Sequence, residues 1–391
     1  MTAASPHSAR PRVLHYITRL GLGGAERVAL DLVRGLKSDV DSAIFAVHGI
    51  AADAIGPALR RELAAAQTPL FCGTRLPLKW GGLLPAGWRA ASAVQAFRPD
   101  LIHLHTEIPE ASYAAMVTLQ PSLKRIPAVR TIHNTVFWSD WPRLGRWCDR
   151  RMAHASIAGV SQGAGEAFAR LRLASGAAAP PAPPAIIFNG VDVGQPPQSL
   201  NRVPGDPIRL LFAGRFEFQK GTDLLPSVLA AARGPANRRL ELTLHGSGAH
   251  EPLLRALAAH PPTGWTVHVR PPVPELSRRM TEFDFVLMPS RFEGQSLVAI
   301  EAMLLAVPLV VTAAPGLCEQ LPPDYPWRAR VDDAADFARV LQSALAATTQ
   351  CRATAAQALA WARERFDPRI MQAGYRRLYA QALEATRTPP A

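Results

Sequence analysis

The sequence predicts an α/β protein made of two consecutive domains, each with a parallel sheet covered by helices on both faces. Strand-like apolar runs alternate with helix-like runs twice along the chain, which is the pattern of parallel sheets. A segment rich in Pro, Ala and Gly separates the two series, between residues 177 and 207. The length of 391 residues suits two domains and is long for a single hydrophobic core.

The first series predicts an N-terminal Rossmann-like domain over residues 1–195. It opens with a strand at 12–17 and a helix at 24–36, in which apolar residues recur at helical spacing. Short buried strands are expected further on, at 42–47, 101–104, 129–133 and 157–160. The run 177–185 contains four prolines and is expected to be an extended loop.

The second series predicts a C-terminal Rossmann-like domain over residues 205–365. A helix is expected at 221–233, and strands are expected at 208–213, 240–245, 265–269, 285–288 and 309–312. The tail, 366–383, has helical periodicity with an apolar stripe made of Ile370, Tyr375, Leu378 and Tyr379. Ligands of such sheets bind beside the carboxyl ends of the strands, so we expect the site between the two domains.

Bulk properties indicate a globular cytoplasmic protein. Apolar residues make up 48% of the chain, and no run reaches the ~18 uninterrupted apolar residues that a membrane span needs. Residues 1–10 lack the apolar core of a signal peptide. The cysteines Cys72, Cys148, Cys318 and Cys351 are scattered, which favours a reduced compartment and no zinc site.

The chain is basic, with a net charge of +12, of which +8 falls on residues 1–200. A basic face can bind an anionic acceptor, an anionic membrane surface or nucleic acid, although no nucleic-acid module is recognisable. Trp138, Trp141 and Trp147 lie among arginines in 137–151, which fits either a membrane interface or ordinary helix packing. We therefore expect at most peripheral contact with the inner face of the cytoplasmic membrane.

The segment 289–303 joins a buried strand to a helix and holds two carboxylates with seven residues between them, Glu293 and Glu301. Free amides at a helix N-terminus bind phosphate, and carboxylates accept hydrogen bonds from sugar hydroxyls. The loop 214–221 carries Arg215 and Lys220, which can reach one diphosphate together. Glycines at 21, 23 and 24 open the first helix and allow close approach of a phosphate.

These segments, in this order, resemble the retaining glycosyltransferases of family 4, which have GT-B architecture. The resemblance covers nearly the whole chain. It implies two facing domains around a cleft, with the C-terminal helix, 366–391, crossing back to the N-terminal domain. It also implies that Glu293 orients the donor sugar and that Glu301 binds the ribose of the donor nucleotide. The implied diphosphate-binding residues are Gly23, Gly24, Arg215, Lys220, Gln295, Ser296 and Leu297. Gln295-Ser296 replaces the family's frequent Phe-Gly, so the sugar stays unassigned.

The resemblance also places His133 against the donor sugar at the reacting centre, as a catalytic residue beside Glu293. His103 and His105 alternate on one strand and point to one face. With no third ligand in the nearby sequence, no metal is expected there. By resemblance, His105 is an acceptor-site residue. Glu107 and Glu110 follow on the same loop, where their carboxylates can accept hydrogen bonds from acceptor hydroxyls.

The function implied is metal-independent transfer of a sugar from a nucleotide-diphosphate sugar, as co-substrate and without a cofactor, to a cell-envelope glycan or glycolipid of lipopolysaccharide, O-antigen or capsule type. A GT-B sugar-nucleotide epimerase is the enzyme alternative, and a catalytically silent binding module is the non-enzyme one. Ser161 lies in a Gly-x-Ser-x-Gly sequence, which keeps a serine hydrolase as a further alternative. The carboxylate pair could also serve a glycosidase.

Overall fold

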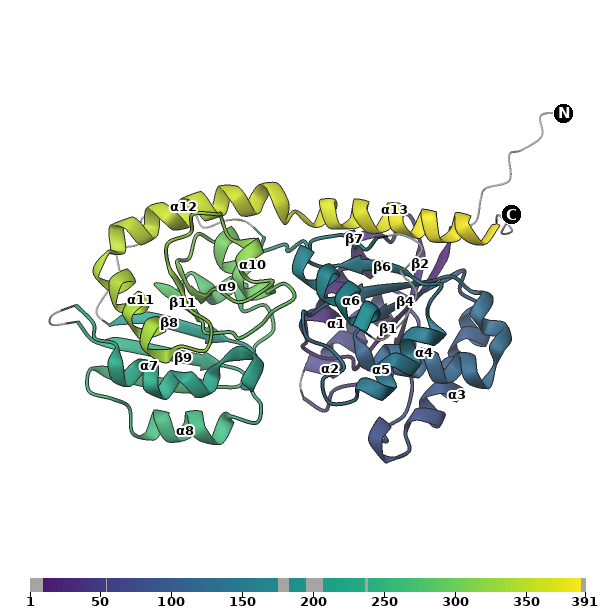
Figure 1. Cartoon of the computed structure of the whole chain (residues 1–391), viewed down its shortest axis with the longest axis horizontal. Coiled ribbons are helices and arrows are strands. Elements are labelled where there is room, and N and C mark those ends of the chain that lie inside the picture. The colour runs from purple at the N-terminus through teal and green to yellow at the C-terminus, as the bar shows by residue number, and fades with distance from the viewer. Residues whose placement is uncertain (1–9, 54, 175–182, 195–206, 236–237, 388–391) are drawn as a thin grey trace.

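The computed structural model describes residues 10–53, 55–174, 183–194, 207–235 and 238–387. Two α/β domains lie side by side in Figure 1, and a long pair of helices runs along both of them. Each domain contains one sheet in which every pairing is parallel, so the predicted fold class is confirmed. The predicted domain boundary, 195–205, lies outside the described residues, so the limits 1–195 and 205–365 stay predictions.

The N-terminal sheet has seven strands in the order β3-β2-β1-β4-β5-β6-β7. Its strands are β1 (Arg12–Ile17), β2 (Asp41–Ala46), β3 (Leu70–Cys72), β4 (Leu101–His105), β5 (Ala128–Ile132), β6 (Ser156–Gly159) and β7 (Ala185–Ile186). The helices around it are α1 (Gly24–Gly35), α2 (Ile55–Ala65), η1 (Leu78–Trp80), α3 (Leu83–Phe97), α4 (Glu107–Leu119), η2 (Pro121–Arg125), α5 (Pro142–Arg151) and α6 (Gln162–Ala174). The central strands β1, β4 and β5 are almost wholly buried, as expected where helices cover both faces of a sheet.

The C-terminal sheet has six strands in the order β10-β9-β8-β11-β12-β13. Its strands are β8 (Ile208–Ala213), β9 (Leu240–His245), β10 (Trp265–Arg270), β11 (Phe285–Met288), β12 (Leu309–Thr312) and β13 (Arg328–Ala329). The helices are η3 (Phe218–Lys220), η4 (Thr222–Leu224), α7 (Leu225–Ala231), α8 (Glu251–Ala259), α9 (Ser277–Met280), α10 (Leu297–Leu304), η5 (Cys318–Gln320), α11 (Ala334–Ala346) and α12 (Thr348–Arg365). The helix predicted at 221–233 is shorter than expected, because the chain first makes two single-turn helices around Gly221.

Each sheet reverses its strand order once, between β1 and β4 in the first domain and between β8 and β11 in the second. The loops that leave the carboxyl ends of such a strand pair part to opposite faces of the sheet and open a crevice for ligands. The residues predicted to bind the donor follow three of these strands: Gly23 follows β1, Arg215 follows β8 and Glu293 follows β11. The topology therefore gathers predicted site residues at the two switch points.

The C-terminal helix α13 (Pro368–Arg387) leaves the second domain and packs on the first, as predicted (Figure 1). Its buried face is made of Met371, Tyr375, Leu378, Tyr379 and Ala382, which pack against α1, β4 and β5. Burying each large apolar side chain is worth roughly 1.5–3 kcal/mol, so this face fastens the domains firmly. Ile370 was wrongly assigned to the stripe: it is half exposed, and Met371 is buried in its place.

Candidate active site

The two switch points face each other, so loops from opposite domains touch. A Cβ on Gly294, in the loop after β11, would lie only 2.1 Å from the carbonyl oxygen of His133, in the loop after β5. The hydroxyl of Thr135 donates a 3.1 Å hydrogen bond to the main-chain oxygen of Glu293. The predicted reacting residue of the first domain is therefore in contact with the predicted sugar-binding loop of the second.

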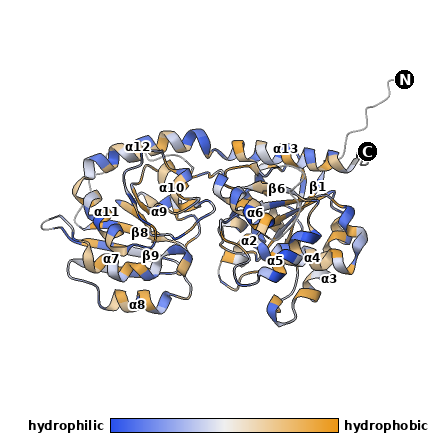
Figure 2. Cartoon of the chain, viewed as in Figure 1, coloured by the Kyte–Doolittle hydropathy of each residue, from blue (hydrophilic) through white to orange (hydrophobic). Residues whose placement is uncertain are grey.

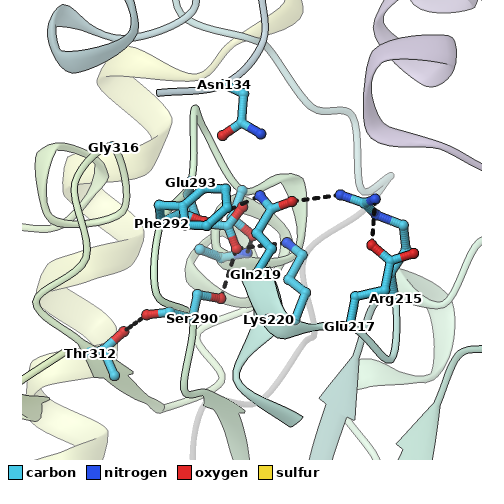
Figure 3. A network of polar contacts seen from close by, with 12 residues as sticks. Asn134, Arg215, Glu217, Gln219, Lys220, Ser290, Phe292, Glu293, Thr312 and Gly316 are labelled. Carbon is cyan, nitrogen blue, oxygen red and sulfur yellow. Dashed lines mark hydrogen bonds and ion pairs between the residues drawn. The ribbon is translucent and has the colours of Figure 1, made fainter. Parts of the chain in front are cut away.

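Glu293 is the centre of a buried polar network in the second domain (Figure 3). Its Oε1 accepts hydrogen bonds from Lys220 Nζ at 2.6 Å and from the Ser290 hydroxyl at 2.8 Å. No described residue donates to Oε2 of Glu293, so that oxygen can accept a bond from a ligand hydroxyl. Thr312 in turn donates its hydroxyl proton to the main-chain oxygen of Ser290, which holds the network on β12.

Lys220 is aimed at Glu293 by a tight turn that only glycine can make. Gly221 has φ of +62°, and a Cβ there would lie 1.9 Å from the main-chain oxygen of Pro289. The close approach of the two loops brings the ammonium of Lys220 to the carboxylate at the end of β11. The two residues of the Lys-Gly pair therefore act together. Gly221 allows the turn that orients the Lys220 side chain, and Lys220 supplies the positive charge.

Arg215 stands at the edge of the same site with its side chain more than half exposed. Its guanidinium donates to Glu217 Oε2 at 2.7 Å and to Gln219 Oε1 at 2.6 Å (Figure 3). Its charge also reaches two carboxyl groups of the first domain: burial raises the pKa of Glu26 and of Glu107, and Arg215 opposes the shift in both. A guanidinium held by surface partners at the domain interface is available to an incoming anion.

The sequence predicts an anion-binding site at the start of α10, where one main-chain donor is already used. Ser296 is the N-cap, and its hydroxyl accepts a 3.4 Å bond from Ala299 N. Gln295 is buried, and its Oε1 accepts a 2.6 Å bond from the Asn189 main chain. Its Nε2 has no partner among the described residues. The side-chain amide of Gln295 and the free amides at the start of α10 thus remain as donors.

Glu301 lies on α10, buried, and forms an ion pair with Arg27 of α1 in the other domain. Burial raises the pKa of the Glu301 carboxyl, and the Arg27 guanidinium lowers it in opposition. Asp31 lies 3.8 Å from the same guanidinium, at the outer end of the group. The residue predicted to bind the donor ribose is therefore held by a cation from the first domain.

At the start of α1, Gly24 leaves open space, whereas a Cβ on Gly23 would lie 2.0 Å from the Glu26 carboxylate. Gly23 is the N-cap of α1, and its neighbour Gly24 has nothing within 4 Å of the position of a Cβ. Neither has a positive φ, so the backbone does not require glycine at either position. The absent side chain at Gly24 leaves room at a helix N-terminus, where a phosphate would be favoured.

A chain of histidines runs from His133 into the first domain. His133 Nε2 lies 3.1 Å from His105 Nδ1, and His105 Nε2 lies 3.3 Å from His15 Nδ1. Burial lowers the pKa of His133 and of His15 to about 3, and it lowers the pKa of His103 and His105 well below the ordinary value. All four imidazoles are therefore neutral at neutral pH.

The histidines correct one expectation, because His15 supplies the third imidazole that the nearby sequence lacked. The ring nitrogens of His15, His103 and His105 lie within 4.8 Å of one another, close enough for a metal ion. Both nitrogens of His103 are already bonded, to the hydroxyls of Tyr379 and Thr131 at 2.7 Å. The donor set fits a metal only if those two bonds are given up.

The predicted acceptor residues divide into two groups. His105 is fully buried behind His133 and offers no surface to an acceptor, so its assignment there is corrected. Glu110 is also excluded, because it forms a two-pronged pair with Arg130 at 2.9 and 3.0 Å inside the domain. Glu107, the first residue of α4, stays half-buried at the domain interface and remains a candidate.

Two further sequence features have structural roles. Trp138 is buried, and Trp141 and Trp147 pack against the same core, so helix packing accounts for the aromatic cluster. Ser161 is buried, and its hydroxyl accepts a 3.1 Å bond from Ala164 N at the start of α6. It also lacks the positive φ of a strained nucleophile turn, so the hydrolase alternative has no structural support.

Sequence reasoning missed three residues that join the domains: Arg27, Asn189 and Glu319. The carboxylate of Glu319 accepts bonds from the main-chain amides of Gln162 and Gly163, at 2.7 and 2.8 Å. Each of the three residues is separated from its partner in the other domain by 106 to 274 residues along the chain. No local pattern reports such pairs, although Arg27 follows directly on the glycine segment that was singled out.

Two models of known protein families match the chain, one in each domain. Residues 22–195 match the family model Glycosyltransferase Family 4, and residues 207–347 match the model Glycosyl transferases group 1. The structure of Anabaena Alr3699/HepE in complex with UDP-glucose superposes with a TM-score of 0.75 at 20% identity, covering 96% of this chain and 99% of that one. Sucrose-phosphate synthase from Thermosynechococcus elongatus gives a TM-score of 0.73 at 16% identity, with coverage of 96% and 100%. At these identities the superpositions establish the fold.

Among curated proteins, D-inositol 3-phosphate glycosyltransferase of Paenarthrobacter aurescens (strain TC1) is 37% identical over 129 residues, 31% of each chain. The match thus spans about a third of the length of this curated relative. The two family models are broader, because each of them matches one domain. On this evidence the chain belongs to the family 4, group 1 glycosyltransferases, with a fold of the GT-B type.

Proposed function

We propose that the protein transfers a sugar, with retention of configuration, from a nucleoside diphosphate sugar to a glycan or glycolipid of the cell envelope. The observation that carries the proposal is the buried pair of Lys220 and Glu293 beside the start of α10. It combines a cation, a hydroxyl acceptor and free helix amides at the point where a sheet of this type binds nucleotides. A sugar and a diphosphate need these three features together.

The positive charge for the leaving diphosphate comes from Arg215 and Lys220. Arg215 can exchange Glu217 and Gln219 for phosphate oxygens, because charge-assisted bonds to phosphate are stronger than those to a neutral amide. The side chain of Lys220 is only 17% exposed, so the field of its ammonium at the site is weakly screened by water. These groups supply the charge stabilisation that the reaction needs, and no metal ion is part of the proposal.

In the proposed reaction the bond between the anomeric carbon and the phosphate oxygen breaks, and a bond to the acceptor oxygen forms on the same face. The acceptor hydroxyl proton passes to the departing phosphate oxygen. In this proposal Glu293 binds donor hydroxyls through Oε2 and does not attack the sugar, because the ammonium of Lys220 and the hydroxyl of Ser290 at Oε1 stabilise the carboxylate and make it a weaker nucleophile. The contact between Gly294 and His133 excludes water that would otherwise hydrolyse the donor.

His133 is proposed to hydrogen-bond the donor sugar as a neutral imidazole. Its pKa of about 3 keeps it uncharged, and its Nε2 is engaged with His105, so Nδ1 is left for the ligand. A neutral group there avoids placing a second charge beside the developing positive charge on the sugar. Glu107, half-buried on the same side of the interface, is the proposed contact for acceptor hydroxyls.

A cell-envelope acceptor is supported by the charge of the first domain, since +8 of the net +12 lies in residues 1–200. Acceptors of this kind are carried on lipids or bear anionic groups, and both favour a basic surface. The relative that acts, by its name, on D-inositol 3-phosphate makes a small phosphorylated acceptor the competitor to test. The protein is accordingly proposed to act in the cytoplasm, at the inner face of the membrane.

The test is a thermal-shift panel of nucleotide sugars, beginning with UDP-glucose, with which Alr3699/HepE was solved. A donor at 100 times its Kd adds about 2.7 kcal/mol to the folded state, which is a measurable shift in Tm. The donor found is then incubated with lipid-linked glycans and with inositol phosphate, and the products are analysed by mass spectrometry and NMR. A new glycoside with retained configuration supports the proposal. An epimerised nucleotide sugar supports the epimerase instead, and no shift with any nucleotide contradicts the donor site.

A further inference from the structure

The segment that enters α3 carries a group of large apolar side chains that the protein leaves in water. Leu76 is 53% exposed, Trp80 74%, Leu84 64% and Trp88 57%. Leu84 and Trp88 are one helical turn apart on α3, so they share a face. Trp80 ends the preceding single turn, η1. These four residues are called the α3 patch below. A cluster of this kind on a soluble surface marks an interaction site, whereas single exposed apolar residues do not.

The charges around the α3 patch are predominantly positive. The chain has no Asp or Glu between Glu62 and Asp100, and within that stretch Arg75, Lys79 and Arg89 are exposed. Helix α5, nearby, adds the exposed residues Arg143, Arg146 and Arg150. In Figure 2 the loop leading into α3, at the lowest part of the first domain, shows apolar and polar colours side by side. Tryptophan beside arginine and lysine is the composition favoured at the interface between water and an anionic bilayer.

Beside the α3 patch, the neighbouring residues Leu78, Lys79 and Leu83 line a pocket of about 490 Å³ together with the start of α5. Its apolar walls come from Leu78 and Leu83 on one side and from Trp141–Leu144 on the other. Lys79 and Arg143 stand among its lining residues, with Asp140 as the one acidic side chain. An apolar pocket with cations at its edge suits the headgroup and first methylenes of an anionic lipid, so the surface offers a site for a lipid molecule as well as exposed apolar side chains.

The α3 patch is also placed where a membrane-borne acceptor would need it. Helix α3 packs closely on α4: a Cβ on Gly87 would lie 2.8 Å from the Ala115 side chain, and Ser112 bonds to the oxygen of Ala86. Helix α4 begins at Glu107, the proposed acceptor contact. One helix pair thus carries the patch on its outer member and an acceptor residue at the start of its inner member.

We propose that the α3 patch docks the protein on an anionic phospholipid bilayer, with Trp80 and Trp88 in the interfacial region and the basic residues against the headgroups. The inference rests on the proposed function, since docking there presents a lipid-borne acceptor to the site. No described helix is long and apolar enough to span a membrane, so attachment by this surface is peripheral. It also moves the membrane contact from the tryptophans in 137–151 to Trp80 and Trp88 of the α3 patch.

The experiment measures co-sedimentation of the full chain with vesicles of phosphatidylcholine alone and with 30% phosphatidylglycerol (about one lipid in three anionic, a composition chosen to resemble an anionic leaflet). Wild type is expected to bind the anionic vesicles and to be released by high salt. Trp80→Ala with Trp88→Ala is expected to weaken binding by about tenfold or more, because two aromatic side chains no longer leave water.

Leu84→Ser and Leu173→Ser make a matched pair of variants. Leu173, on α6, is 70% exposed and lies outside the patch, so only Leu84→Ser should lose affinity. All variants are also tested for a thermal shift with UDP, because none of these positions belongs to the proposed donor site. An equal loss in both leucine variants, or unchanged binding in the double tryptophan variant, would overturn the docking assignment.

Two further outcomes separate this inference from the function on which it rests. A wild type that binds UDP and ignores anionic vesicles keeps the donor site and overturns the docking surface. A wild type that binds vesicles and no nucleotide overturns the proposed function and leaves the docking surface standing. A patch-dependent dimer in solution, without vesicle binding, would assign the α3 patch to a second copy of the chain and overturn the bilayer as its occupant.

Discussion

Replacing Lys220 by Met tests the centre of the site, because methionine keeps an unbranched side chain only one atom shorter and removes the charged ammonium with its hydrogen bond. The ammonium lies 2.6 Å from Glu293, and both groups are largely buried. Removing one partner of a buried pair costs about 3–5 kcal/mol, and the partial exposure of Lys220 reduces this to roughly 1–3 kcal/mol. Loss of one cation from the departing diphosphate should lower kcat by about 10²–10³-fold, on the scale of one lost oxyanion donor.

The assays are urea unfolding and initial rates of nucleotide release from the donor found in the panel. The control is Lys220→Met combined with Glu293→Gln, which removes the stranded carboxylate and should restore most of the stability but none of the activity. A stable Lys220→Met with nearly normal kcat would refute the argument, since it would show that the lysine neither holds Glu293 nor stabilises the leaving group.

Four other predictions concern the frame of the site and the histidines behind it. Gly221→Ala should cost about 1–3 kcal/mol in unfolding free energy, because φ is +62° and a carbonyl blocks the Cβ. Gly24→Ala, with open space, should keep stability and weaken nucleotide binding in calorimetry. Arg27→Ala should destabilise by roughly 1–3 kcal/mol at pH 7, and Glu301→Gln in the same chain should reverse most of that loss. His15 has a pKa of about 3 when folded and 6.5 when unfolded, so the unfolded chain binds the extra proton below pH 6.5. Stability should therefore be full above pH 6.5 and fall toward acid, and His15→Leu should reduce that slope by about 1.4 kcal/mol per pH unit in urea titrations from pH 6 to 5.

The parts of the fold that local patterns control could be predicted. Strands such as 12–17, 208–213, 240–245 and 285–288 have the predicted limits, because a buried parallel strand is a short apolar run bounded by turn residues. The helix after Gly221 was predicted too long. The chain around Gly221 forms two single-turn helices, a geometry that the contact of Lys220 with Glu293 decides and that helical propensity does not reveal. The local conformation of the chain was thus harder to predict where contacts between distant segments decide it.

Candidate site residues were found where they lie on short segments, and missed where a distant partner defines them. Glu293 and Lys220 belong to two recognisable loops that the structure brings to 2.6 Å. Arg27 and its partner Glu301 are 274 residues apart, and only the assembled domains join them. The tryptophans show the same limit: composition alone favoured Trp138, which the core buries, over Trp80, which is exposed.

The pairing of Arg27 with Glu301 links the proposed donor chemistry to the arrangement of the domains. Glu301 is the proposed acceptor for ribose hydroxyls, yet its carboxylate is already bound to a guanidinium of the other domain. Because Arg27 is partly exposed and also lies near Asp31, it can release Glu301 without being left unpaired. Ribose hydroxyls would then replace one charged bond at the interface. The same carboxylate can therefore bind Arg27 of the other domain in the absence of donor and bind the ribose hydroxyls in its presence. Donor binding and the contact between the domains thus depend on one residue, Glu301.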